Sequence, residues 1–314
     1  MNKDKLAMRD AYGETLIELG SVNEDIVVLD ADLSGSTRTA FFAKAFPNRF
    51  FNMGISEQDM VGTAAGLACV GKIPFLSSFA MFASGRAWEP IRNSVCYPNL
   101  NVKVVCSHAG ITVGEDGASH QALEDISIMR SIPNMRVLIP ADYYETKQMI
   151  KFIANTSGPF YMRFSRSATP VVFSDQYQFN PNEYPVLRTG SDAAILANGI
   201  MLHSAILAAN QLQQENISVT VVNVHSVKPV LTDQIARIAA ETRAIVTAEE
   251  HNIIGGMGSA VAEALAKTVP TPIEFVGTQD CFGESGKPED LLVKYHLMPE
   301  DIVKAVKTVL ARKK

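Results

Sequence analysis

Residues 52–70 read Asn-Met-Gly-Ile-Ser-Glu-Gln-Asp-Met-Val-Gly-Thr-Ala-Ala-Gly-Leu-Ala-Cys-Val, which predicts a turn followed by a helix. Gly54 permits the turn, and Ser56 is a favourable N-cap, with Asp59 three positions later as in a capping box. The helix is nearly all small or apolar, which is typical of a buried helix that another backbone approaches closely. Glu57, at its first position, is either a functional carboxylate or only a residue that stabilises the helix dipole.

Predicted strands and helices alternate on both sides of this stretch. Up to residue 164 the predicted strands are 26–30, 50–52, 73–77, 102–107, 136–139 and 160–164, and the predicted helices are 3–20, 37–46, 57–70, 84–95, 121–130 and 143–154. The alternation predicts an α/β fold with a parallel sheet covered by helices on both faces. Ligands of such folds bind beyond the carboxyl ends of the strands, where Asp30, Asp32, Ser77 to Phe82 and His108 are expected.

A second, smaller α/β unit follows a segment without periodicity. That segment, 167–190, contains Pro170, Pro181 and Pro185 and is interpreted as a linker. In the second unit we expect strands near 192–197, 217–223, 243–248 and 273–276, and helices near 200–214, 232–240, 257–267 and 299–311. The predicted domains are therefore 1–166 and 191–314, as the length of the chain allows.

The composition indicates a globular protein with a large core, since 47% of the residues are hydrophobic and 19% are charged. A net charge of −5 gives no basic patch suited to nucleic acid. The four cysteines stand singly, without metal-ligand spacing, which favours free thiols in a reducing cytoplasm. We expect no signal peptide and no membrane span, because no apolar run of about 18 residues is free of charge.

Two motifs resemble those of transketolases. Gly-Ile-Ser-Glu-Gln-Asp-Met at 54–60, followed by Ala-Ala-Gly-Leu-Ala, is similar to the catalytic glutamate motif of these thiamine-diphosphate enzymes. Gly-Glu-Asp-Gly-Ala-Ser-His-Gln at 114–121 resembles the transketolase motif Gly-Glu-Asp-Gly-Pro-Thr-His-Gln. The resemblance extends over essentially the whole chain but matches only the second half of an ordinary transketolase, namely the pyrimidine-binding and C-terminal domains.

The resemblance implies a set of cofactor-binding residues for thiamine diphosphate. Glu57 would hydrogen-bond N1′ of the aminopyrimidine, which favours the imino tautomer that deprotonates the thiazolium carbon. Phe79 and Phe82 match two aromatic positions of the pyrimidine slot, although ordinary core residues would give the same pattern. Asp32 matches an aspartate near the thiamine moiety, or caps the following helix. The chain departs from the family at Gly85, where an aromatic residue is usual.

The resemblance also implies substrate-binding residues. His120 would bind the donor ketose near the reacting carbon and help to move protons, and Asp116 would bind a substrate hydroxyl. The loop that carries both is otherwise a set of turn-forming residues. His108 matches a histidine near the sugar phosphate, although a satisfied core histidine is the alternative. Residues that align with the phosphate-holding positions are Arg9, Ser36 and Arg166, and an arginine fork suits a terminal phosphate.

One family element is missing from this sequence. Family members bind Mg²⁺ and the cofactor diphosphate through a Gly-Asp-Gly motif, which this chain lacks, so we assign it no metal ligands. A diphosphate requires a metal or a cationic clamp. We therefore expect a separate N-terminal subunit to bind the Mg²⁺ and the diphosphate, with two copies of each chain.

The sequence predicts the C-terminal subunit of a split transketolase, which transfers a two-carbon ketol unit from a ketose phosphate to an aldose phosphate. Three alternatives remain: half of a 1-deoxyxylulose-5-phosphate synthase-like enzyme, the beta subunit of a 2-oxo acid dehydrogenase, and a non-catalytic binding subunit. The sugar pair is left open.

Overall fold

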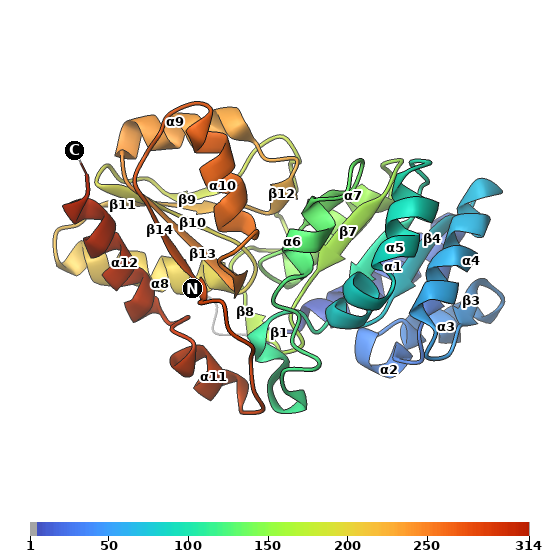
Figure 1. The fold of residues 1–314 in the computed structure, drawn as a ribbon. Coiled ribbons are helices and arrows are strands. Elements are labelled where there is room, and N and C mark those ends of the chain that lie inside the picture. Colours follow the sequence, from blue (N-terminus) through green and yellow to red (C-terminus); the bar gives the residue numbers. More distant parts are fainter. Residues whose placement is uncertain (1–4, 314) are drawn as a thin grey trace.

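The computed structural model describes residues 5–313, which form two α/β units (Figure 1). The first unit has a seven-stranded sheet in the order β12-β6-β7-β5-β4-β2-β3. Its strands are β2 (Ile26–Asp30), β3 (Phe50–Asn52), β4 (Ile73–Ser77), β5 (Lys103–Cys106), β6 (Arg136–Leu138), β7 (Phe160–Arg163) and β12 (Ser226–Lys228). All neighbouring strands are parallel except β12, which pairs antiparallel with β6. The predicted parallel sheet is confirmed.

Helices cover both faces of this sheet because alternate residues of its strands point to opposite sides. Ile26 and Val28 pack in a cluster with residues of α1 (Met8–Val22), α3 (Ala40–Ala45) and α7 (Tyr143–Ala154). Val27 and Leu29 pack in a second cluster with residues of α4 (Glu57–Cys69) and α6 (Asp125–Arg130). The strand is therefore buried on both faces, as its apolar sequence predicts.

The second unit has a five-stranded sheet in the order β14-β13-β10-β11-β9, in which only β9 pairs antiparallel. Its strands are β9 (Val186–Arg188), β10 (Ala193–Ala197), β11 (Val219–Asn223), β13 (Ile245–Asn252) and β14 (Ile273–Thr278). Its helices are α8 (Met201–Gln214), α9 (Thr232–Thr242), α10 (Met257–Ala266), α11 (Pro288–Lys294) and α12 (Pro299–Ala311). The predicted α/β class thus holds for both units.

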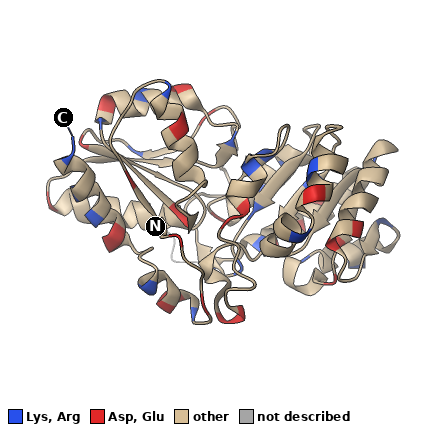
Figure 2. Cartoon of the chain, in the orientation of Figure 1, with Lys and Arg blue, Asp and Glu red and all other residues tan. Residues whose placement is uncertain are grey.

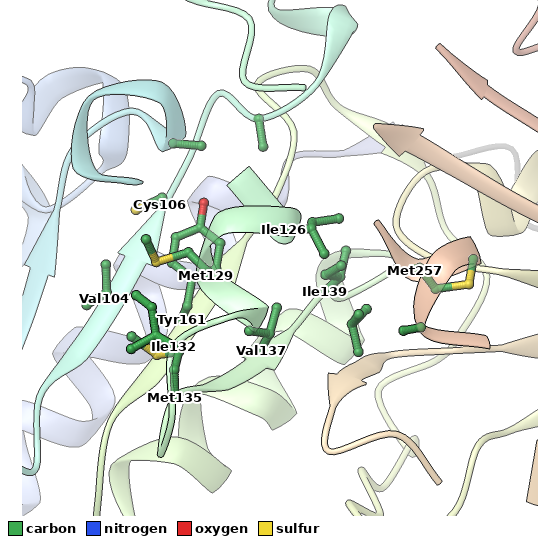
Figure 3. Packing of buried hydrophobic residues seen from close by; sticks show 14 of the residues in the cluster. Val104, Cys106, Ile126, Met129, Ile132, Met135, Val137, Ile139, Tyr161 and Met257 are labelled. Carbon is green, nitrogen blue, oxygen red and sulfur yellow. The ribbon is translucent and has the colours of Figure 1, made fainter. Parts of the chain in front are cut away.

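The two units share strands and a core. β9 lies within the segment interpreted as a linker but pairs with β11, and β12 extends the first sheet from within the second unit. A two-stranded sheet joins β1 (Lys5–Leu6) to β8 (Thr169–Pro170). Figure 3 shows one buried cluster that runs from Val104 and Tyr161 through Ile139 to Met257 of α10. None of these four short strands, of two or three residues each, is predicted from the sequence.

Several predicted helices differ in their bounds. The predicted helix 37–46 is interrupted at Arg38, whose φ of +72° ends α2 (Ser34–Thr37) before α3 begins. The predicted helix 84–95 consists of two π-helical segments, 82–86 and 91–96, around the short α5 (Trp88–Pro90). The helix predicted at 121–130 begins only at Asp125. The predicted helix 3–20 begins at Met8, and its first two positions lie outside the described residues.

The helix at Glu57 corrects two expectations. Ser56 occupies the N-cap position, but its side chain makes no capping hydrogen bond. The helix is also not buried all round. Met60, Val61 and Ala64 face the core, whereas Gly62 and Gly66 are exposed, and no atom lies within 4 Å of where a Cβ would stand at either glycine. A row of small residues therefore lies open on the outer side of α4.

Charged residues of both signs are interspersed along both units (Figure 2). No helix within residues 5–313 is long and apolar enough to cross a membrane.

Candidate active site

The predicted site residues gather where the parallel strands of the first sheet end. The strand register places Asn52 and Ser77 on either side of Asp30. Asp32 follows β2, Phe79 follows β4, and a bridge between Phe79 and Ser107 links the segments after β4 and β5. This is the edge at which ligands bind in doubly wound sheets.

Glu57 is a buried carboxylate with an unused acceptor. It begins α4, directly after the turn that Gly54 makes with a φ of +67°. Its side chain is 3% exposed, and Oε2 has no hydrogen-bond partner within residues 5–313. An unpaired buried polar atom costs about 1–3 kcal/mol. The geometry therefore fits a ligand that donates a hydrogen bond to this oxygen.

Two phenylalanines and two histidines form one aromatic group. Phe79 and Phe82 stack with ring centroids 5.7 Å apart, and Phe79 also stacks on His108 with ring centroids 3.8 Å apart. His120 meets the group edge-on, 5.2 Å from Phe82 and 6.2 Å from Phe79. Four residues predicted separately from the sequence thus lie in one group, in which Phe79 neighbours the other three.

His108 is held as a neutral imidazole. It is 2% exposed, has a φ of +57°, and its Nδ1 lies 2.8 Å from Ser107 Oγ. Burial lowers the pKa of His108 to about 3, and the charges of Arg9 and Arg166 contribute to the lowering. At neutral pH the ring is therefore a hydrogen-bonding group and not a cation.

The predicted phosphate-holding residues come from three separate elements. Arg9, on α1, donates from Nη1 to the carbonyl oxygen of Ser36 at 3.2 Å, and burial lowers its pKa. Arg166, after β7, donates to Val113 O at 2.8 Å and lies 3.7 Å from Asp116 Oδ2. The charges of both guanidinium groups lower the pKa of His108.

A third arginine that acts on the pKa of His108 is not among the residues predicted from the sequence. Arg38 also lowers the pKa of both His108 and Arg9 and is oriented by an ion pair with Asp10 at 2.5 Å. Arg38 lies between α2 and α3 with a left-handed backbone conformation, and a helical sequence pattern does not predict such a residue. Arg38 and Arg166 are paired with carboxylates, namely Asp10, Glu115 and Asp116. Guanidinium groups are the side chains that suit a phosphate, so these three arginines are the candidates for binding an anion.

Asp32 lies at the same edge of the sheet but is exposed and paired with Asn52, whose Oδ1 and Nδ2 both bond to it at 3.2 Å. It does not cap the following helix, which corrects the alternative raised from the sequence. Asp30 binds beside that helix, with Oδ1 accepting from the backbone N of the N-cap residue Leu33 at 2.6 Å and Oδ2 accepting from the Thr37 hydroxyl at 2.7 Å, but no side chain caps the helix.

Comparison with family models identifies the family of both units. Residues 4–171 match the transketolase pyrimidine-binding domain, and residues 182–302 match the transketolase C-terminal domain. The chain belongs to the transketolase family. Members of this family depend on thiamine diphosphate. The predicted resemblance is therefore confirmed, and the chain corresponds to the C-terminal section of a split transketolase.

Relatives of full length show the same split organisation. A transketolase C-terminal section from Methanocaldococcus jannaschii is 51% identical over 95% of both chains. A 6-deoxy-6-sulfo-D-fructose transketolase subunit SqwH from Clostridium sp. (strain MSTE9) is 42% identical, covering 98% of this chain and 95% of its own length. An apulose-4-phosphate transketolase subunit from Phocaeicola vulgatus is 34% identical over 97% of both. By contrast, the chain spans 49% of a mouse transketolase-like protein 2, to which it is 35% identical.

Solved structures agree with this fold. A split-gene transketolase, described as an inactive beta4 tetramer, is 51% identical with a TM-score of 0.91 and covers 99% of this chain and 100% of its own. A transketolase from Campylobacter jejuni, at 23% identity and a TM-score of 0.83, shares the fold over 97% of this chain and 47% of its own.

Proposed function

We propose that this chain is the pyrimidine-binding, C-terminal subunit of a two-chain transketolase that moves a two-carbon ketol unit from a ketose phosphate to an aldose phosphate. The observation that carries the proposal is the buried, unpaired Oε2 of Glu57, at the same sheet edge as the group formed by Phe79, Phe82, His108 and His120. A carboxylate, a flat apolar slot and two imidazoles are the groups that thiamine chemistry uses.

Glu57 accepts the hydrogen bond from N1′ of the aminopyrimidine in this proposal, and Phe79 and Phe82 contribute to the apolar slot for the ring. Asp32, just after β2, lies near the thiamine moiety. When bound, thiamine diphosphate supplies a nucleophilic carbon and an acceptor for the electron pair of the cleaved C–C bond. Oε2 of Glu57 gains a hydrogen-bond partner when the cofactor binds, so the free-energy cost of the unpaired oxygen is removed on binding.

The two histidines, Asp116 and the arginines bind the substrate in this proposal. His120 holds the donor ketose near its reacting carbon and exchanges protons with its hydroxyl groups. His108, neutral at pH 7, donates or accepts hydrogen bonds there, and Asp116 binds a substrate hydroxyl. The terminal phosphate is bound by Arg9, Arg166 and Ser36, with Arg38 as an additional cation.

An N-terminal subunit binds Mg²⁺ and the diphosphate in this proposal, and two copies of each chain assemble. Within residues 5–313 no group of three His, Cys, Asp or Glu side chains could hold a metal ion. The open row of small residues on α4 suits close approach by another chain. The relative that forms a tetramer of this type of chain alone is described as inactive, which supports the need for a second kind of subunit.

The relatives point to a second candidate substrate class. Two of them are named as subunits of transketolases for 6-deoxy-6-sulfo-D-fructose and apulose 4-phosphate, so a sulfonated or branched sugar is the alternative to a common pentose phosphate. The arginine site accommodates either a phosphate or a sulfonate, since both present tetrahedral oxygens to guanidinium donors. A sulfonate carries a single charge, and the ratio of affinities for the two anions tests this choice.

The test is a coupled assay with xylulose 5-phosphate, ribose 5-phosphate, thiamine diphosphate and Mg²⁺. It is run on the chain alone, on the chain with the N-terminal subunit, and on that mixture with Glu57→Ala. We expect activity only in the mixture, abolished by the substitution. Full activity of the lone chain contradicts the two-chain site, and unchanged activity of Glu57→Ala favours a non-catalytic binding subunit. Activity with pyruvate and glyceraldehyde 3-phosphate instead favours the 1-deoxyxylulose-5-phosphate synthase-like alternative.

A further inference from the structure

The loop that carries His120 belongs to the first unit by sequence but is anchored by the second. Strand β13 holds both of its ends. Thr112 donates from its backbone N and from Oγ1 to Glu250 Oε1, each at 2.7 Å, and Asn252 N donates to Leu123 O at 2.9 Å. Leu123 is itself buried in the hydrophobic cluster built mostly by α8, α12 and the second sheet. The second unit therefore fixes where this loop begins and ends.

Gln121 connects the middle of the loop to the second unit. Its Nε2 donates to Glu284 O at 2.9 Å and to Ile111 O at 3.1 Å, and the side chain is 2% exposed. The ring of the preceding residue, His120, contacts Phe82. Two consecutive side chains thus join the segment around Glu284 to the candidate substrate site.

The segment 282–287 approaches the loop too closely for larger residues. A Cβ at Gly283 would overlap Gln121 Oε1, and a Cβ at Gly117, which has a φ of +76°, would lie 2.5 Å from Ser285 Oγ. Tyr295, just after α11, donates from its hydroxyl to Phe282 O at 3.1 Å and steadies the segment. Figure 1 shows this part of the chain beside the loop at the lower edge of the molecule.

We propose that the second unit positions His120, with Gln121 as the positioning residue and the segment 282–287 as its support. This inference rests on the proposed role of His120 in donor binding. It gives the C-terminal unit a function in the reaction that its sequence does not indicate. Because misplacement by about 1 Å can cost 10²-fold in rate, small changes at Gln121 or Gly283 should act at His120.

A double-mutant cycle on the assembled enzyme tests the inference. Gln121→Glu keeps the side-chain size, but an ionised carboxylate cannot donate to Glu284 O, and we expect kcat/KM for the donor ketose to fall about ten- to hundred-fold. In the His120→Ala background the same change should cost less than about twofold, because Gln121 acts through His120. Equal losses in both backgrounds, or no loss in the first, overturn the proposal. Glu284→Gln is the matched control, because it keeps the accepting carbonyl and alters only an exposed carboxylate paired with Lys294.

A second measurement separates this inference from the proposed function. In ¹³C-histidine NMR spectra of the isolated chain, Gly283→Ala should move the ring resonance of His120, although residue 283 is distant in sequence, whereas Glu284→Gln should leave it in place. An unchanged His120 resonance in Gly283→Ala overturns the positioning role even if the enzyme is an active transketolase. If the wild-type assembly lacks transketolase activity, the proposed function fails, and the NMR comparison still decides the coupling.

Discussion

Phe79 and His108 stack face to face, with ring centroids 3.8 Å apart and planes inclined by 15°, where β4 and β5 end. The stack occupies one face of the imidazole, and burial removes water from the rest of the ring. The surrounding charges on Arg9, Arg38 and Arg166 all oppose a proton on His108. The contact with Phe79 therefore orients this histidine, while burial and the arginine charges keep it neutral.

Protonation of His108 should lower the free energy of unfolding as the pH falls below 6.5. Its folded pKa of about 3 lies below its ordinary value of 6.5, so the unfolded chain binds the proton first. The corresponding stabilisation is fully present above pH 6.5 and is lost as the pH falls toward 3. We expect the free energy of unfolding, measured by urea titration, to fall less steeply between pH 6.5 and 4 in His108→Asn than in wild type.

Glu57→Gln should separate activity from stability. The substitution keeps the shape of the side chain and replaces an unpaired buried oxygen by an amide group that is equally without a partner, so the free energy of unfolding of the isolated chain should change by less than about 1 kcal/mol. Activity of the assembled enzyme should fall by about 10²-fold or more, as for loss of a general acid–base group. Asp59→Asn, an exposed change in the same helical turn, should leave both quantities nearly unchanged. A Glu57→Gln chain that is clearly less stable than wild type would show that the buried carboxylate is already well paired.

The elements that the sequence predicts well are those whose signals are local. The bounds 143–154 of α7 are predicted correctly because Asp142 accepts from Glu145 N at 2.9 Å, a cap within one turn. The helix predicted at 121–130 begins late because residues 111–124 follow contacts to Glu250 and Asn252, which lie far along the chain. Strand β12 is missed for the same reason, since its only partner within the described residues is β6.

The candidate site also contains residues that local motifs identify and residues that only long-range contacts identify. The motifs around Glu57 and His120 identify residues that the fold brings to one edge of the sheet, and the stacking of Phe79 on His108 follows from adjacent parallel strands. Arg38 reaches the site through a left-handed residue between two short helices, and Gln121 matters through the carbonyl of Glu284, far along the chain. Neither contact has a signature in sequence spacing.

The exposed face of α4 should be needed for assembly and not for folding. No atom lies within 4 Å of where a Cβ would stand at Gly66, so Gly66→Leu should change the free energy of unfolding of the isolated chain by less than about 1 kcal/mol. The larger side chain should prevent close approach by the N-terminal subunit and abolish association in size-exclusion chromatography. Lys304→Leu, on an exposed position of α12 in the second unit, controls for added surface hydrophobicity. Normal association of Gly66→Leu would place the subunit interface elsewhere.

Deprotonation of the buried Lys103 should raise the free energy of unfolding as the pH rises above 7. Its side chain is fully buried at the start of β5, where Nζ donates to Asn101 Oδ1 at 2.6 Å and to the carbonyl oxygens of Thr156 and Gly158. Burial and the nearby charge of Arg136 lower its pKa to about 7, against 10.5 for the ordinary side chain. Between pH 7 and 10.5 the unfolded chain therefore binds a proton that the folded chain does not, and folding becomes more favourable as the pH rises.

The expected slope is at most about 1.4 kcal/mol per pH unit for this one group. It should appear in urea titrations of wild type between pH 7 and 9 and should be absent from Lys103→Met. Lys151→Met, which removes an exposed lysine paired with Glu18 at 2.8 Å, should retain it. If wild type and Lys103→Met show the same dependence on pH, Lys103 keeps its proton in the folded chain, and its three acceptors stabilise the ammonium group more than burial destabilises it.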